Sequence, residues 1–367
     1  MNKASKVQKK SLFPFAAYHL GLAAVLLLMI LNKIFNGPSR SARNALTMTL
    51  LEPSGTKWIP PLFLGKKTVE QIRNSGKNKA VDTADKLTAV SEFETACNVI
   101  SADIDWDLYP DGIKIESYKG RTYNAHIMLV KDPSRLYLAL SSYHGFSESL
   151  PGKRLHIMME EEKAAAGVNA GAFNDDGSAG SHVGSVPAGL IIHEGRVCSN
   201  VHKELVPEQG FGGFDKNHVL VVSSDMSEEK ALKEGILEGC EFGPVLIKNN
   251  VINRSVYSGS SGYNPRTALG QRADGTVILL CVDGRQAGSF GATYRDLTDI
   301  MTAYGACSAI NMDGGSSSAM FYRDESGIYG ERGQIRIINS YSVMQTIPRR
   351  MPTFWMVKPL RGESDDQ

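Results

Sequence analysis

Hydrophobic residues along the chain form one long run and many short ones, and the two kinds predict different structures. The long run covers residues 12–31 and is apolar almost throughout. A helix of about 20 such residues crosses the hydrocarbon core of a bilayer. We therefore predict a transmembrane anchor over residues 12–31, behind a basic cytoplasmic tail over residues 1–11.

Flanking charges indicate how this segment crosses the membrane. Four lysines precede it, but Lys33, Arg40 and Arg43 follow it, so the positive-inside rule only slightly favours an inside N-terminus. A cleaved signal peptide is the alternative interpretation, and residues 32–43 offer no convincing small-x-small cleavage site. We expect a single-pass protein of the cell membrane whose main domain is extracytoplasmic.

The chain changes character after the long run. Residues 32–95 are predicted to form a membrane-proximal stalk or linker, with a short apolar patch at 58–64 that lies on the membrane or on the main domain. Disorder is the alternative over 74–90, where Lys, Asn and Thr dominate. The main domain should then cover residues 96–360, followed by a disordered acidic tail over 361–367.

Within the main domain, short apolar runs alternate with turn residues, which is typical of β-strands with a few helices. We predict an α+β or α/β fold with a mixed β-sheet core, packed helices and βαβ units, preceded by one N-terminal transmembrane helix. The expected strands are 113–118, 124–130, 136–141, 168–169, 219–223, 276–282, 308–312, 335–338 and 353–357, the expected helices are 153–166, 227–235 and 293–304, and the expected hairpins are 187–198 and 244–253.

The stretch from 265 to 322 organises the rest. The continuous apolar run 276–282 predicts a strand buried on both faces, the segment 293–304 has helical spacing, and 308–312 predicts another strand. Asp-Gly pairs follow both strands, at Asp283 and at Asp313. If the strands are parallel, both loops emerge at the same carboxyl edge of one sheet, which is where open sheets bind ligands.

Composition excludes some classes of function. The net charge is +1 and 22% of the residues are charged, so the basic excess of a nucleic-acid-binding protein is absent. The five cysteines show neither CxxC nor Cys/His ligand spacing, which argues against a zinc site. Their spacing gives no reason to expect a Cys198–Cys240 disulfide, although it leaves one open.

The loop after the second strand, residues 311–318, reads Asn-Met-Asp-Gly-Gly-Ser-Ser-Ser. Two glycines let a ligand approach the backbone closely, and successive amides and hydroxyls can bind phosphate or sugar oxygens; a plain turn is the alternative. Arg285, on the other Asp-Gly loop, offers a planar fork for phosphate. Arg266 and Thr267 begin a strand nearby, where a ligand-binding role and a solvated charge are equally good interpretations.

A third glycine-rich loop covers residues 169–177. Asn169 could supply an amide and Phe173 a stacking face for a sugar ring, or Phe173 could fill the core beneath the loop. Asp175 and Asp176 are more typical of solvent-facing or calcium-binding loops than of catalysts.

No nucleophile partner is evident for any histidine. His126 and His144 are therefore predicted to be structural, and His182 and His193 to be exposed loop residues. The chain contains neither a Gly-x-Ser-x-Gly elbow nor a His-Glu-x-x-His motif.

These motifs, in this order, resemble the phosphodiester glycosidase family, and in particular its bacterial, membrane-anchored members associated with exopolysaccharide. The resemblance covers about residues 110–358, and its first loop reads Asn-Ala-Gly-Ala-Phe where the family usually has Asn-Gly-Gly-Phe-Phe. It rests on Asn169-Ala-Gly-Ala-Phe, Gly243-Pro-Val-Leu, Pro265-Arg-Thr-Ala-Leu-Gly, Val282-Asp-Gly-Arg and Asn311-Met-Asp-Gly-Gly-Ser-Ser-Ser.

The resemblance implies cleavage of a sugar-1-phosphodiester into free sugar and a phosphomonoester. Phosphate is a good leaving group, so donors that hold it should matter more than a general acid. A carboxylate must still stabilise the oxocarbenium-like carbon or activate water. For this chemistry we choose Asp313 first and Asp283 second as the catalytic carboxylate, and we expect substrate or phosphate binding by Arg285, Arg266, Thr267, Asn169, Phe173, Asn311, Gly314, Gly315, Ser316 and Ser317.

Two other functions remain open at this stage. One is a non-catalytic glycan-binding or scaffold protein of polysaccharide assembly. The other is a phosphodiesterase that cuts the P–O bond with calcium or magnesium held by Asp175, Asp283 and Asp313. We expect a phosphorylated glycan as the substrate, the membrane as a partner through residues 12–31, no nucleic acid and no cofactor unless one of these two metals is required.

Overall fold

A computed structural model describes residues 12–51, 55–76, 87–89, 103–174, 183–206, 208–259, 261–343, 345 and 347–360. The chain divides into two compact units, Met1–Gly76 and Lys77–Gln367. The predicted tails 1–11 and 361–367 lie outside the described residues.

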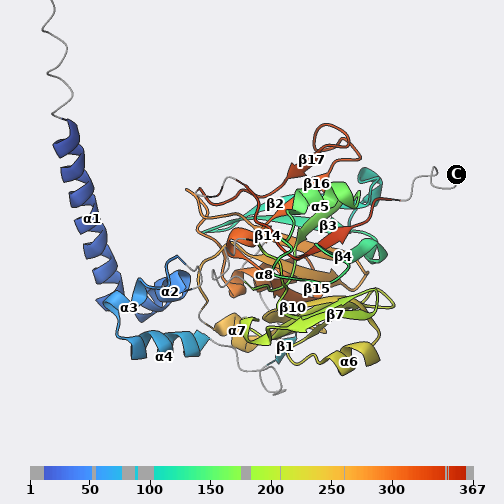
Figure 1. Cartoon of the computed structure of the whole chain (residues 1–367), viewed down its shortest axis with the longest axis horizontal. Helices are drawn as coiled ribbons and strands as arrows, with labels where there is room; N and C mark the ends of the chain where they lie inside the picture. Colours follow the sequence, from blue (N-terminus) through green and yellow to red (C-terminus); the bar gives the residue numbers. More distant parts are fainter. Residues whose placement is uncertain are drawn as a thin grey trace, which may run out of the picture. The chain divides into compact units, whose positions relative to one another are not determined.

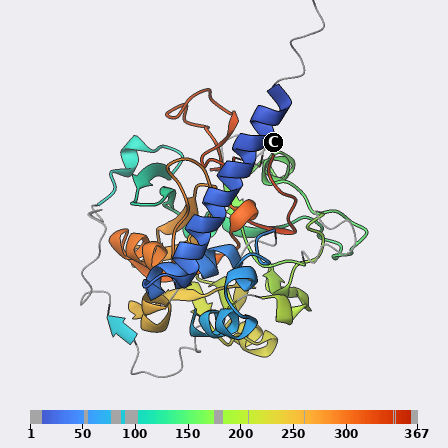
Figure 2. The same cartoon turned by 90° about the vertical axis from the view of Figure 1, so that its left-hand side faces the viewer.

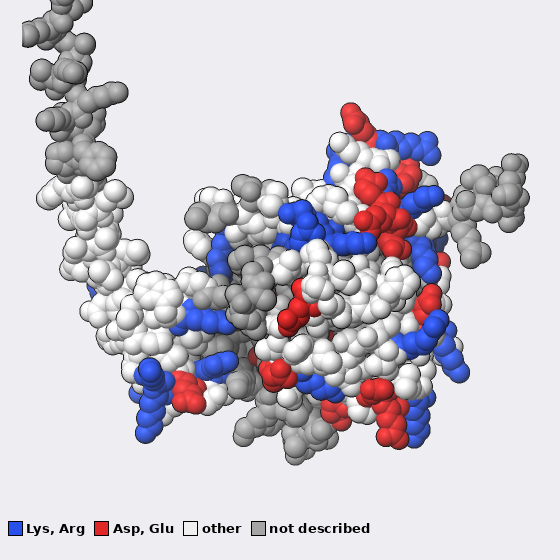
Figure 3. Space-filling view, viewed as in Figure 1, with Lys and Arg blue, Asp and Glu red and all other residues white. Residues whose placement is uncertain are grey.

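The described part of the first unit consists of helices joined by turns and bends. Its helices are α1 (Leu12–Asn36), α2 (Arg40–Leu51), α3 (Pro60–Phe63) and α4 (Lys66–Gly76). The segment Ala17–Asn36 of α1 is long and apolar enough to cross a membrane, a test that signal sequences also pass. Side chains on the outside of α1 are apolar and exposed, as Figure 3 shows for its uncharged visible side.

The predicted stalk therefore contains a small folded cluster. The short helices gather at the C-terminal end of α1 in both views of the unit (Figures 1 and 2). Phe35, only 1% exposed, stacks on Phe63 with ring centroids 4.9 Å apart. Leu64, Val69 and Ile72 complete this core. Proline at the first position of α3 suits a helix start, because that residue's missing N–H would have no partner in the helix.

The second unit contains three sheets, and every strand pair in its described part is antiparallel. The first has the order β1 (Leu87–Ala89), β12 (Val251–Asn253), β11 (Val245–Lys248), β15 (Ala306–Met312), β13 (Thr267–Arg272), β14 (Val277–Val282), β3 (Asn124–Val130), β2 (Ile113–Lys119). The second has the order β7 (Arg196–Val201), β6 (Gly189–His193), β10 (Ile236–Phe242), β8 (Gly210–Asp215), β9 (Leu220–Ser223). The third has the order β17 (Ile335–Ile337), β16 (Met320–Arg323), β5 (Ala166–Asn169), β18 (Thr353–Val357), β4 (Leu136–Leu140).

The three sheets share one hydrophobic core. Leu269 from the first sheet, Phe214 from the second and Trp355 from the third belong to the same buried cluster, and the Phe214 and Trp355 rings meet edge to face at 5.7 Å. Helices pack on the sheets' other faces, α7 (Arg254–Ser258) and α8 (Tyr294–Ala303) on the first, α6 (Glu228–Lys233) on the second and α5 (Leu155–Glu161) on the third. Burying each large side chain stabilises this arrangement by about 1.5–3 kcal/mol.

The predicted βαβ unit is present. Strands β14 and β15 both run antiparallel to β13, which lies between them, so they are parallel to each other. Helix α8 connects them, and Thr293 and Asp296 form a capping box at its start. The predicted α+β architecture with a mixed arrangement of sheets and helices, preceded by one apolar helix, is confirmed.

One predicted element differs clearly. The helix expected over 153–166 ends at Glu161, because Lys163 has a left-handed φ of 52° and the chain then enters a sheet. Ala165 donates its N–H to the Val357 carbonyl at 2.8 Å, and β5 begins at Ala166. Small alanines have high helix propensity, but here their burial between strands decides the structure.

Charged residues are mixed on the surface of the second unit. Lys and Arg side chains alternate with Asp and Glu over the face shown in Figure 3. On that face there is no extended basic surface.

Candidate functional site

One edge of the first sheet brings the predicted loops together. Thr267, at the start of β13, is in register with Cys281 on β14 and with Met312 on β15. Asp283 and Asp313 therefore both follow strands that end beside the start of β13. The expectation that the two Asp-Gly loops share an edge is correct.

Asn169 connects this edge to the third sheet. It is fully buried at the end of β5 and uses both ends of its amide. Its Nδ2 donates to the Asp313 carbonyl at 2.6 Å, and its Oδ1 accepts from the Thr267 hydroxyl at 2.6 Å and from the Ala319 N–H at 3.1 Å. Thr267 is fully buried as well. These two residues hold the Asp313 loop in place from beneath it.

The Asp313 loop is compact and partly exposed. Asp313 is half-buried, and its N–H donates to the Ala170 carbonyl at 3.0 Å. The Gly314 amide donates to the Asp313 carboxylate at 2.8 Å, and the Gly315 amide donates to the Pro265 carbonyl at 2.8 Å. These two amides, predicted as phosphate donors, are thus used inside the protein. Ser316 is the exposed residue of the loop.

The first glycine of this loop, Gly314, is required because the backbone of Pro265 lies very close to it. A Cβ on Gly314 would lie 2.6 Å from the Pro265 carbonyl oxygen, which is closer than real Cβ contacts come. Gly315 has a φ of +62° with open space around its Cβ position, so its requirement is conformational. The Asp-Gly-Gly pattern thus places the loop backbone directly against Pro265, just before β13.

Polar atoms without partners lie on the same segment. The Asn311 Oδ1, Ser317 Oγ and Ser318 Oγ atoms are buried and make no hydrogen bond within the described part of the chain. Asn311 still uses its Nδ2, which donates to the Gly243 carbonyl at 2.7 Å. Buried unsatisfied groups are uncommon and concentrate at sites with a function.

Asp283 lies deeper than its predicted role requires. It is 3% exposed, and its carboxylate accepts hydrogen bonds from the Ser340 N–H at 2.7 Å and from His126 Nε2 at 3.0 Å. Asn124 and Gln286 donate to its other oxygen. Burial opposes ionisation, but these hydrogen bonds, His126 foremost, lower the pKa of Asp283 below its usual value. Through these contacts the Asp283 carboxylate supports the loop.

The two predicted arginines are held by neighbouring backbone. Arg266 is 4% exposed, donates to the Ala292 and Gly262 carbonyls, and lies 4.1 Å from the Tyr294 ring centroid. Arg285 is half-buried and donates to the Tyr263 carbonyl at 3.2 Å and to the Asn264 side chain.

Arg349 is a site residue that the sequence analysis missed. Its guanidinium lies 4.8 Å from the Phe173 ring centroid and donates to the Ser316 hydroxyl at 3.4 Å. It therefore joins the Asn169 loop to the exposed tip of the Asp313 loop. Phe173 is half-buried against the cluster that contains α5, so the two predictions for it, a stacking face and a core contact, both describe part of its surroundings. No motif surrounds Arg349 in the sequence, and only the fold brings it here.

The remaining candidates fall into different places. His126, predicted to be a structural histidine, bridges Ser117 at 3.0 Å and Asp283 at 3.0 Å. His144 is exposed. Cys198 and Cys240 are free thiols, one exposed and one buried. Asp175, Asp176 and His182 lie outside the described residues, within which no three His, Cys, Asp or Glu side chains gather to bind a metal.

Comparison with known proteins gives a family match. A family model described as phosphodiester glycosidase (NAGPA) matches residues 162–358, more than half of the 367-residue chain. The chain is 25% identical over 280 residues to the SPbeta prophage-derived uncharacterized protein YomE of Bacillus subtilis (strain 168). That alignment covers 73% of this chain but 40% of YomE, so the chain spans about two fifths of its relative's length.

A solved structure shows a similar fold. The zebrafish N-acetylglucosamine-1-phosphodiester alpha-N-acetylglucosaminidase (NAGPA) catalytic domain, auto-inhibited by its pro-peptide, superposes with a TM-score of 0.51. It is 20% identical, and the match covers 67% of this chain and 82% of that domain. A protein of Burkholderia pseudomallei K96243 with a solved crystal structure is 16% identical with a TM-score of 0.45, over 65% of this chain and 74% of its own.

Proposed function

Because the chain belongs to the phosphodiester glycosidase family, we propose that it hydrolyses a sugar-1-phosphodiester, releasing the free sugar and leaving a phosphomonoester on the other partner. The observation that carries this proposal is the edge where the half-buried Asp313 lies between the buried Asn169 support and the Arg349–Ser316 contact. A carboxylate and a guanidinium on neighbouring segments suit a bond between a sugar carbon and a phosphate.

Asp313 is the carboxylate that we assign to the reaction. It stabilises the positive charge that develops on the sugar carbon as the phosphate leaves, or it activates the attacking water. Its backbone is held on both sides, by the Asn169 amide at 2.6 Å and by the Ala170 carbonyl at 3.0 Å. A carboxylate fixed in this way loses little freedom when the substrate binds.

Cations at the rim would hold the departing phosphate. Arg349 is half-buried beside the exposed Ser316, where a phosphate oxygen can reach both the guanidinium and the hydroxyl. Arg285 is a second cation on the same edge. Arg266, buried against Tyr294, and Asp283, buried among its donors, support the loops on which the others stand.

The substrate that we propose is a cell-envelope or exopolysaccharide glycan outside the cytoplasm. The apolar helix α1 would anchor the chain as a single-pass membrane protein with its N-terminus inside. The four lysines before the span favour this orientation slightly, against Lys33, Arg40 and Arg43 after it.

One assay tests the activity. The full chain in detergent is incubated with a panel of sugar-phosphate-methyl diesters, with and without a chelator, and the products are identified. Free sugar and methyl phosphate in both conditions are expected. Sugar-1-phosphate that disappears with chelator would instead support the metal-dependent phosphodiesterase, and absence of turnover on the whole panel would favour a non-catalytic glycan-binding protein.

Matched variants connect the activity to the site. Asp313→Asn should lower turnover by at least about 100-fold, because removing a charge that acts only in the transition state costs several kcal/mol there. Asp107→Asn, on an exposed residue, should leave turnover unchanged. Equal activity of the two variants would contradict the assignment of Asp313.

A further inference from the structure

A cavity of about 890 Å³ lies away from the Asp313 edge. It opens between β4, the edge strand of the third sheet, and the turn that joins β6 to β7 in the second. None of its lining residues belongs to segments 169–174, 262–267, 283–286 or 311–318. Its volume falls within the range of about 300–1,000 Å³ that small-molecule sites occupy.

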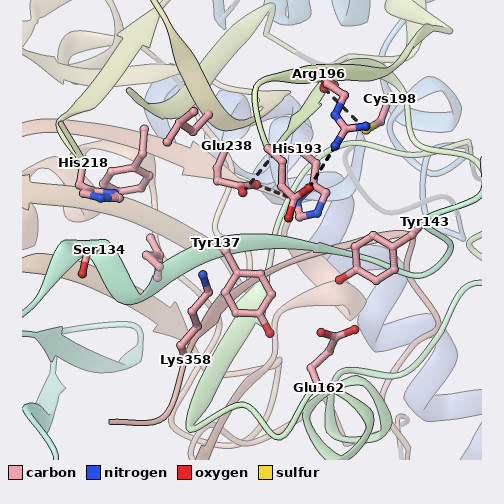
Figure 4. A pocket seen from close by; sticks show the side chains of 14 residues that line it. Ser134, Tyr137, Tyr143, Glu162, His193, Arg196, Cys198, His218, Glu238 and Lys358 are labelled. Atoms are coloured by element: carbon pink, nitrogen blue, oxygen red, sulfur yellow. Dashed lines mark hydrogen bonds and ion pairs between the residues drawn. The ribbon is translucent and has the colours of Figure 1, made fainter. Parts of the chain in front are cut away.

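Three polar side chains point into this cavity from different segments. Figure 4 shows Tyr137 of β4, Tyr143 of the following loop and Glu162 at the end of α5 directed toward a common space. Burial raises the pKa of both tyrosines, so their hydroxyls stay protonated. The Tyr137 hydroxyl donates to the Met356 Sδ at 3.7 Å, and the Tyr143 hydroxyl interacts with Glu162. Tyr143 is 46% exposed, so its ring is accessible to a ligand.

On the opposite wall, hydrogen bonds connect three strands. Glu238 accepts hydrogen bonds from the Leu138 N–H at 3.1 Å and from His193 Nδ1 at 3.0 Å. It thereby ties β10 to β4 and to the end of β6. His193, predicted from sequence to be an exposed loop residue, is half-buried here and its ring lies 5.2 Å from that of Tyr143. The pair forms a preformed polar and aromatic surface.

The charges of the lining select among ligand classes. Three glutamates line the cavity against one arginine, one lysine and two histidines, and one of the histidines, His193, pairs with Glu238 at 3.0 Å. Arg196 already pairs with Glu194 at 3.5 Å, and Lys358 lies 5.5 Å from the Tyr137 ring centroid. A site for phosphate or a polyanion would need an excess of positively charged side chains. A site for a polyamine would not contain Arg196 and Lys358. Aromatic faces with carboxylate acceptors and hydroxyl donors suit an uncharged, hydroxyl-rich ring.

We infer that this cavity binds a neutral sugar residue of the glycan, at a distance from the bond that is cleaved. The inference rests on the proposed function only in taking the ligand from a glycan. The ring of Tyr143 would pack against the apolar face of the sugar, and Glu162 would accept hydrogen bonds from its hydroxyls.

Calorimetric titration of the full chain in detergent tests this inference. The probes are neutral tetrasaccharides of glucose, N-acetylglucosamine, galactose or mannose, with spermidine and inorganic phosphate as charged comparisons. At least one tetrasaccharide should bind, and both Tyr143→Ala and Glu162→Gln should weaken it about tenfold. Tyr143→Phe keeps the ring and should retain most of the affinity. Melting temperatures would confirm that the variants fold.

Either of two outcomes would overturn the inference. One is that no tetrasaccharide binds, whether or not spermidine or phosphate does. The other is tetrasaccharide binding that neither Tyr143→Ala nor Glu162→Gln weakens. Asp313→Asn separates this inference from the proposed function, because it should abolish hydrolysis of the small diesters and leave tetrasaccharide binding intact. Loss of binding in Asp313→Asn would place the sugar at the Asp313 edge.

Discussion

The amide of Asn169 is the most informative single perturbation of the site, because it joins β5, β13 and the Asp313 loop. Asn169→Ala removes one hydrogen bond to the Asp313 carbonyl at 2.6 Å, one from Thr267 at 2.6 Å and one from the Ala319 N–H at 3.1 Å. Asn169 and Thr267 are both 0% exposed and Ala319 is 1% exposed, whereas the bond to the half-buried Asp313 is part-buried.

The size of the effect follows from these contacts. A buried hydrogen bond contributes a net of about 1 kcal/mol, so three of them contribute about 3 kcal/mol to the free energy of unfolding. At roughly 2–4 °C per kcal/mol for a domain of this size, the melting temperature should fall by about 6–12 °C. Asn169→Asp should cost more, because it turns a carboxylate toward the Asp313 carbonyl in a buried place.

Urea unfolding of the full chain in detergent, followed by tryptophan fluorescence, measures this loss. Trp355 is buried in the core of the second unit and reports its unfolding. Asn217→Ala is the control, since Asn217 is exposed in a turn and should change the stability by less than about 0.5 kcal/mol. Turnover of the folded variant should fall as well, because the Asp313 backbone is no longer held. A loss of stability below about 1 kcal/mol, or full turnover in Asn169→Ala, would refute the reasoning.

Three further predictions concern the same edge. Gly314→Ala should lower turnover at least about tenfold, because the added Cβ displaces the Pro265 carbonyl. Gly315→Ala should mainly lower the free energy of unfolding, by about 1 kcal/mol. Kinetics and melting temperatures of the two variants test this, and equal effects would contradict it. Arg349→Ala should lower kcat/KM about 10- to 100-fold, and Arg349→Lys should lower it less. Arg350→Ala, at the neighbouring position, is the control. Unchanged kinetics in Arg349→Ala would show that Arg349 is not part of the site. The pKa of Asp283 is lowered in the folded protein, so its contribution to stability is present above the unfolded pKa of about 3.9 and is lost as pH falls through the folded pKa. The difference in stability between wild type and Asp283→Asn should therefore shrink on acidification. Melting temperatures between about pH 3 and 7 measure this difference, and a difference that grows toward low pH would contradict the prediction.

Local patterns in the sequence were sufficient for the elements around the site. The apolar run before Asp283, the capping residues Thr293 and Asp296, and the glycine pairs are short-range signals, and they correctly predicted a strand–helix–strand unit with both loops at one edge. The motifs also identified the phosphodiester glycosidase family, which the family model confirms. The long apolar run likewise predicted the one membrane-length helix in the described residues.

Tertiary structure decided what each of these side chains can do. Asp283 and Asp313 have similar sequence surroundings. In the fold, Asp283 is buried and bonded to His126 and Ser340 from distant segments, whereas Asp313 is half-buried. Arg349 and the cavity beside Tyr143 depend on contacts between residues far apart in the chain, for which no local pattern exists. A sequence pattern reports the conformation that neighbouring residues favour, whereas burial, hydrogen-bond partners and cavities arise only when separate segments pack against each other.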